Sequence, residues 1–308
     1  MGAPLSTSTR TGTGTEIVLT GTGVPHPRPG TAGAGVLVRH EDVALQFDAG
    51  RSTVMRLMEA GTPPYALTAL FLTHVHSDHV VDVPDLAMAR WVQQKSHPSG
   101  PLTVVAPSGA PERFVRRMLD PYEEDIALRI AHVGADPIQV DLRPFPVTST
   151  ASEVWRSADG QVRVLAVGVH HEPVPDAVAY RVETPDGVVV VSGDTRVCAE
   201  VAALSAGADV VVHEACRATA LAPLIAGTAF ETIFSYHADT VALGAMAARA
   251  GVPHLVLTHL IPPLERDGDA ESFAVDVRSG GYEGRITVGR DLTSITLPNS
   301  DAPAAATR

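Results

Sequence analysis

Short apolar runs recur along the chain between polar, glycine-rich and proline-rich stretches, and most have the length of a β-strand. Ala69-Leu70-Phe71-Leu72 is continuously apolar, which is typical of a strand buried on both faces. Residues 162–169 are predicted as a strand by the alternation that begins at Val162-Arg163-Val164. The same reasoning predicts strands at residues 17–20, 35–38, 43–47, 102–106, 177–183, 187–191, 209–212 and 255–257.

Segments with helical periodicity lie between and after these strands. Residues 52–60 form one such segment, which ends at the stop signal Gly61-Thr62-Pro63-Pro64. Residues 120–160 and 217–235 give no clear pattern. The acidic run 123–125 favours a solvated face, and the apolar stretch 221–234 favours a lid or an interface. Further helices are predicted at residues 85–94, 112–119, 197–206 and 237–250.

Residue types that bind metals recur where the apolar strands stop. Two runs of strands with helices between and after them indicate an α/β fold of stacked sheets. Strand ends of such a fold can meet at one rim, where binding sites form. The residues concerned are Asp48, His74, His171, Asp194, Glu214 and His259.

The densest cluster is Thr73-His74-Val75-His76-Ser77-Asp78-His79, which directly follows the apolar run 69–72. The chain has only 13 histidines in 308 residues, so three within six positions are improbable by chance. His74 and His76 are two residues apart and leave the strand end on the same side. Asp78 and His79 come after the chain has turned, which favours two adjacent metal ions. Imidazole and carboxylate ligands without thiolates are typical of a catalytic ion rather than a structural zinc.

These pieces together resemble the metallo-β-lactamase-fold hydrolases, in the branch that contains tRNA 3′-processing endonuclease and arylsulfatase-type enzymes. The resemblance extends over residues 17–260, and the pieces occur in the order of the family. They are Gly21-Thr22-Gly23 with Asp48, residues 73–79, His171 with Ala179-Tyr180-Arg181, residues 192–196, His213-Glu214-Ala215, His237 and Thr258-His259.

The resemblance implies a four-layer αβ/βα sandwich with two metal ions, usually Zn²⁺. Two such ions a few Å apart can acidify a bridging water to hydroxide and stabilise a developing oxyanion. Asp194 would bridge the ions, and Asp48 would orient ligand imidazoles from outside the ligand set. The resemblance places His74, His76 and His171 on the first ion, and Asp78, His79 and His259 on the second.

The resemblance also implies a proton donor, His237, supported by the carboxylate of Glu214; Asp78 is counted with them as catalytic. His170 and His171 compete for one ligand position. We choose His171 because it lies nine residues before Tyr180, the spacing of the resembling enzymes. The other histidines are expected to be structural (His213) or to lie in loops and on the surface (His26, His40, His97, His132 and His254).

Composition narrows the function further. The net charge is −12, which argues against a general polyanion-binding protein. Cys198 and Cys216 are expected to be buried free thiols. Residues 1–16 lack the apolar segment of a signal peptide, and no run of 18 apolar residues occurs, so a cytoplasmic protein without membrane contact is expected. We expect one domain at residues 17–298, with flexible ends at 1–16 and 299–308.

The tRNA-processing enzymes carry a long basic arm between the tyrosine of Ala-Tyr-Arg and the Ser-Gly-Asp-Thr strand. Here residues 181–191 form only a short hairpin, and Leu260-Ile261-Pro262-Pro263 departs from the family pattern. We therefore rank a dinuclear zinc hydrolase of small esters first: a sulfate ester, phosphodiester, lactone or thioester. The alternative is a tRNA 3′-processing endoribonuclease. A non-hydrolytic metalloprotein ranks below both. Such a protein needs no proton donor, whereas this chain has His237 and Glu214. A homodimer is also expected, since family members often form one.

Overall fold

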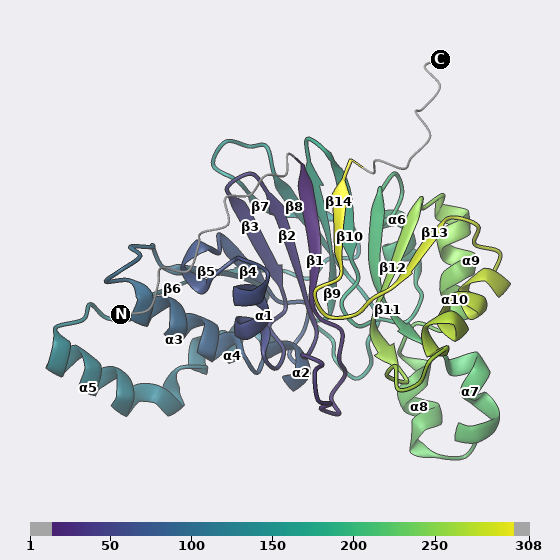
Figure 1. Cartoon of the computed structure of the whole chain (residues 1–308), viewed down its shortest axis with the longest axis horizontal. Helices are drawn as coiled ribbons and strands as arrows, with labels where there is room; N and C mark the ends of the chain where they lie inside the picture. The colour runs from purple at the N-terminus through teal and green to yellow at the C-terminus, as the bar shows by residue number, and fades with distance from the viewer. Residues whose placement is uncertain (1–13, 299–308) are drawn as a thin grey trace.

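The computed structural model describes residues 14–298 and contains two seven-stranded mixed β-sheets that pack face to face (Figure 1). The strand order of the first sheet is β14–β1–β2–β3–β4–β5–β6, and that of the second is β13–β12–β11–β10–β9–β8–β7. The first sheet comprises β1 (Thr15–Gly21), β2 (Gly35–His40), β3 (Val43–Phe47), β4 (Ala69–Phe71), β5 (Leu102–Pro107), β6 (Val140–Phe145) and β14 (Ser294–Leu297). The second comprises β7 (Ser152–Arg156), β8 (Arg163–Gly168), β9 (Val178–Thr184), β10 (Gly187–Val191), β11 (Val210–Cys216), β12 (His254–Ile261) and β13 (Arg285–Val288).

Helices cover the outer faces of both sheets and complete four layers (Figure 1). On the first sheet lie α1 (Thr53–Glu59), α3 (Val83–Gln93) and α4 (Ala110–Arg117). On the second lie α6 (Ala199–Leu204), α9 (Thr240–Ala250) and α10 (Asp269–Ser279). The remaining helices are the short α2 (Ser77–Val80), α5 (Glu123–Val133), α7 (Ala218–Ile225) and α8 (Ala229–Ser235), with 3₁₀ turns at Pro64–Ala66 and Asp120–Tyr122.

Successive side chains of each strand point to opposite faces of the sheet, and both faces are packed against apolar neighbours. In β2, Val36 and Val38 point into the core between the sheets, while Leu37 points outward to the helices. In β10, Val189 points inward and Val190 outward. Such strands are buried on both sides, so their sequences are almost continuously apolar.

An aromatic group joins the two sheets next to the cluster 73–79. The ring of Tyr180, on β9, lies 5.3 Å from Phe47 and 5.5 Å from Phe71 of the other sheet, measured between centroids. Its fully buried hydroxyl donates a 2.6 Å hydrogen bond to the Leu72 carbonyl oxygen. Tyr180 therefore holds Leu72 in place, the residue directly before the cluster 73–79.

The predicted four-layer sandwich is confirmed, and the structure corrects several element boundaries. Strand β11 continues to Cys216 because its parallel pairing with β12 does, so Glu214 lies inside the strand rather than after it. Helix α9 begins at Thr240 rather than at 237, because the Asp239 side chain accepts the Ala242 amide and caps it. The illegible residues 120–160 contain α5, β6 and β7, and no prediction covered α10, β13 or β14.

Two histidines expected in loops or at the surface are instead buried in strands, which corrects that expectation. His40 Nδ1 lies 3.0 Å from Thr15 Oγ1 and 2.9 Å from Asp186 Oδ2, and so links the far ends of the two sheets. His254 is fully buried in β12 with Nε2 2.8 Å from Thr287 Oγ1. Both lie in strands whose polar partners the sequence does not reveal.

Both cysteines are free; Cys216 is buried, whereas Cys198 is only partly so. None of the helices in the described part of the chain has the length and apolar character to cross a membrane. The flexible ends predicted at 1–16 and 299–308 lie outside the described residues, except for Gly14 and for Thr15 and Glu16, which already belong to β1.

Tyr180→Phe removes the hydroxyl but keeps the ring. The Leu72 carbonyl then loses its buried donor, so the free energy of unfolding should fall by about 1–2 kcal/mol in urea denaturation. Tyr282→Phe serves as the matched control, since its hydroxyl makes a longer bond (3.1 Å) in a part-buried position. An equal loss in both variants would contradict the role given to Tyr180.

Candidate active site

Side chains of the predicted ligand types from both sheets meet at one end of the sandwich. Helix α2, which carries two of them, marks this lower end in Figure 1. His74 and His76 lie in the loop after β4, Asp78 and His79 on α2, and His171 after β8. Asp194 follows β10, and its neighbour Gly193 (φ 58°) lies so close to Thr73 that an added Cβ would be 2.7 Å from Thr73 Cβ.

A β-bulge directs His259 into this group. In the pairing of β11 with β12, Glu214 lies opposite Thr258 and Ala215 opposite Leu260, which leaves His259 as the extra residue. Its φ of 43° is unusual for a residue with a side chain. Bulges re-aim side chains in this way, often next to active sites.

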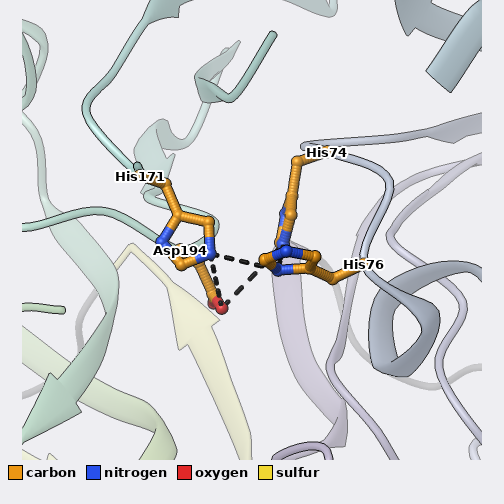
Figure 2. Close-up of side chains that lie close together, drawn as sticks. All are labelled: His74, His76, His171 and Asp194. Atoms are coloured by element: carbon orange, nitrogen blue, oxygen red, sulfur yellow. Dashed lines mark hydrogen bonds and ion pairs between the residues drawn. The ribbon is translucent and has the colours of Figure 1, made fainter. Parts of the chain in front are cut away.

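The first half of the site contains three imidazoles and the Asp194 carboxylate, and Figure 2 shows these four side chains converging. His76 Nδ1 lies 3.0 Å from His74 Nε2 and 3.1 Å from His171 Nε2. Asp194 Oδ2 lies 3.9 Å from His74 Nε2 and 3.7 Å from His171 Nε2.

Asp78, His79 and His259 form the second half. His259 Nε2 lies 3.2 Å from Asp78 Oδ2, and His79 Nε2 lies 3.7 Å from the same oxygen. Asp194 contacts this half as well, with Oδ1 3.3 Å from His79 Nε2 and Oδ2 3.4 Å from His259 Nε2. One buried carboxylate therefore lies between two groups of three side chains.

The residues fit divalent cations in both halves. In the first half three imidazole nitrogens converge at 3.0–3.1 Å. In the second, the buried His79 Nε2 and Asp194 Oδ1 make no hydrogen bond within the described residues. Burial and the neighbouring imidazoles hold the pKa of His74 well below its usual value, which keeps it neutral as a ligand must be. Although burial opposes ionisation, the surrounding histidines hold the pKa of Asp194 well below normal, so it is a carboxylate.

Asp48 supports both halves from outside the group. Its Oδ1 accepts the Thr73 amide (2.7 Å), and its Oδ2 accepts the Thr73 hydroxyl (2.6 Å) and lies 2.7 Å from His79 Nδ1. The Thr73 hydroxyl is in turn 3.0 Å from His74 Nδ1. Such contacts fix ring orientation and tautomer. The role of Thr73 in this network was not predicted.

His237 and Glu214 form a pair beside the first half. His237 Nδ1 lies 3.0 Å from both Glu214 carboxylate oxygens, and Oε1 also accepts the Thr195 amide (2.7 Å). Burial lowers the pKa of His237, but the charge and hydrogen bond of Glu214 outweigh it and raise the pKa to about 9. The imidazole is therefore protonated at neutral pH. Its ring centroid lies 5.1 Å from that of His171.

The structure separates the two competing histidines. His171 is buried in the group, and its Nδ1 lies 3.3 Å from the Tyr236 carbonyl oxygen, a contact that no sequence pattern indicated. The side chain of His170 is 42% exposed, with Nε2 3.4 Å from Glu200 Oε2. His213 is buried, with Nδ1 2.8 Å from the Glu214 carbonyl oxygen, and lies outside both halves.

Comparison with known proteins agrees with this geometry. The family model described as Beta-lactamase superfamily domain matches residues 45–260. The chain belongs to this superfamily. Its membership and its histidine–aspartate clusters confirm the predicted class, a metal-dependent hydrolase of the metallo-β-lactamase fold.

The chain is similar to ribonuclease Z of Mycolicibacterium paratuberculosis, with 36% identity over 276 residues that cover 89% of this chain and 94% of that protein. In fold it resembles the short form of human tRNase Z, with TM-score 0.68, 19% identity and coverage of 92% and 99%. It also resembles the metallo-β-lactamase fold protein YhfI from Bacillus subtilis, with TM-score 0.68, 18% identity and the same coverage.

Asp48→Asn tests the supporting network of this superfamily member. The amide cannot accept from Thr73 and His79 as the carboxylate does, so the affinity for Zn²⁺ should fall by about 10–100-fold in chelator competition. Glu200→Gln, which changes the partner of His170, should leave the affinity unchanged. Equal affinities for the wild type and Asp48→Asn would remove Asp48 from this role.

Proposed function

We propose that the chain is a dinuclear metal-dependent phosphodiesterase that cleaves RNA, with the 3′ extension of precursor tRNA as the first substrate to test. The observation that carries the proposal is the position of Asp194. It lies within 4 Å of His74 and His171 on one side and of His79 and His259 on the other. A carboxylate so placed is suited to bridge two cations.

In this proposal His74, His76 and His171 hold one ion, and Asp78, His79 and His259 hold the other. When bound, the ions would supply Lewis acidity to the phosphoryl group and activate water for attack. Zn²⁺ suits the donor set, which combines imidazoles with carboxylates and contains no thiolate.

His237 is proposed as the acid that protonates the leaving oxygen. Glu214 binds its Nδ1, which leaves a proton on Nε2 for transfer. The pKa of about 9 keeps that proton in place at neutral pH. Glu214 itself is held by the Thr195 amide, so the pair is oriented before substrate binds.

The relatives support RNA over the small ester that the sequence ranked first. That ranking depended on the short hairpin between Tyr180 and Asp194. The aligned region covers 94% of the M. paratuberculosis protein, which is called ribonuclease Z, and this chain extends along nearly all of it. A compact chain is therefore compatible with that activity, and the short hairpin alone does not exclude it.

A small phosphodiester is the second candidate. Strands β9 and β10 pair from Thr184 and Gly187 onward, so the turn between them has room for no arm. The net charge of −12 also disfavours a long polyanion.

Removal of metal tests the shared chemistry of both candidates. Protein dialysed against chelator should lose hydrolysis of bis(p-nitrophenyl) phosphate, and about two equivalents of Zn²⁺ should restore it. Circular dichroism before and after dialysis controls for unfolding. Full activity in metal-free protein would refute the mechanism. A higher kcat/KM for precursor tRNA than for the aryl diester favours the first candidate, and the reverse favours the second.

Glu214→Gln tests the acid pair through pH dependence. Without the carboxylate, burial dominates and lowers the pKa of His237, so the acid loses its proton at lower pH. The alkaline limb of the kcat/KM profile, expected near pH 9 in the wild type, should move down by at least about one unit. Glu200→Gln should not move it. An unchanged limb in Glu214→Gln would remove His237 from the acid role.

A further inference from the structure

A cavity of about 200 Å³ opens beside the half of the site that contains Asp78 and His259, between the loop after β1 and the segment after β12. Leu260 lines it and is the next residue after His259; its amide donates to the Thr22 carbonyl oxygen (3.3 Å). On the other side, the Arg51 carbonyl oxygen accepts the Gly33 amide (2.9 Å), and an added Cβ at Gly33 would lie 2.8 Å from the Asp78 carbonyl oxygen. The walls of the cavity are thus backbone neighbours of the proposed ligands.

Three arginines line this cavity: Arg28, Arg51 and Arg290. Arg28 forms an ion pair with Glu265, which joins the two walls. Arg51 Nη2 donates to the Val24 carbonyl oxygen (3.0 Å) but has no ion-pair partner between residues 14 and 298. Arg290 is exposed, and its guanidinium has no partner in the same described range. Two guanidinium charges are therefore not compensated by carboxylates.

Among residues 14–298, Asp291 is the one acidic residue that lines the cavity, and its carboxylate is already engaged. It accepts the amides of Thr22 (3.0 Å) and Ala32 (2.7 Å) and the Thr22 hydroxyl (3.0 Å). It also pairs with Arg56 Nε at 3.0 Å, and Arg56 is shared with Glu59. The lining itself thus contains three guanidinium groups and one engaged carboxylate. The lining is therefore cationic, although the chain as a whole carries a net charge of −12.

The lining also contains apolar residues, namely Val24, Leu260, Pro263 and Leu264. Two of these residues, Leu260 and Pro263, belong to the segment after His259 that departs from the family pattern. Guanidinium groups bind phosphate oxygens in a fixed, bidentate geometry, and an apolar wall suits the sugar and base attached to such a phosphate. A cavity that combines guanidinium groups with apolar side chains fits a nucleotide better than an isolated anion.

We propose that this cavity binds a second phosphate of the substrate, one nucleotide away from the bond that is cleaved, through Arg51 and Arg290. The inference rests on the proposed phosphodiesterase function. It narrows the substrate class to di- and oligonucleotides and separates them from diesters that carry a single phosphate.

Dinucleotides with and without a terminal phosphate test this subsite. In the wild type, either pApA or ApAp should have a KM about tenfold below that of ApA, because hydrogen bonds to a charged group are gained. Arg290→Ala, and separately Arg51→Met, should collapse this ratio. Arg249→Ala, an exposed arginine on α9 outside the cavity, should preserve it. Equal KM values for the three dinucleotides, or a ratio that survives both variants, would overturn the subsite.

Direct binding separates failure of the subsite from failure of the proposed function. Chelator-treated protein is titrated with AMP by calorimetry, so that no metal ion can hold the phosphate. The wild type and Arg249→Ala should bind AMP, and Arg290→Ala should bind it about tenfold more weakly. Absence of AMP binding in the wild type overturns the subsite whether or not diesters are cleaved. AMP binding without cleavage of any diester refutes the phosphodiesterase alone.

Discussion

The buried carboxylate of Asp194 is the interaction on which the candidate site depends. Four imidazoles from both sheets lie within 4 Å of its two oxygens. Burial opposes this charge, and the histidines offset that cost. Neither sheet alone could assemble the group, because Asp194 follows the second sheet while His74 and His79 follow the first. The site therefore requires the sandwich to be closed.

The contact that holds the two sheets together lies close to the candidate site. Tyr180, on the second sheet, donates a hydrogen bond to the carbonyl oxygen of Leu72, which follows a strand of the first sheet. The next residue is Thr73, whose amide donates to Asp48. Asp48 then connects that threonine to His79. A continuous series of contacts thus connects the packed aromatic rings to the imidazoles of the site. Each residue in this series restricts the position of the next.

Much of this could be predicted from the sequence, because the strands are nearly continuous apolar runs and the ligand types directly follow them. The cluster 73–79 was informative because its histidines are close in sequence as well as in space. His40 and His254 were misjudged, since their partners Thr15, Asp186 and Thr287 are distant in sequence. The cavity could not be predicted either, because Arg51 and Arg290 come together only in the fold.

The bulge at His259 has a consequence for how this scaffold can change over evolution. Thr258 and Leu260 already pair with consecutive residues of β11, so loss of the one residue between them would restore a regular ladder. The neighbouring strands would keep their register and the core its side chains. Deletion of this one residue would thus remove one proposed metal ligand and leave the fold intact, so activity could be lost without loss of the structure.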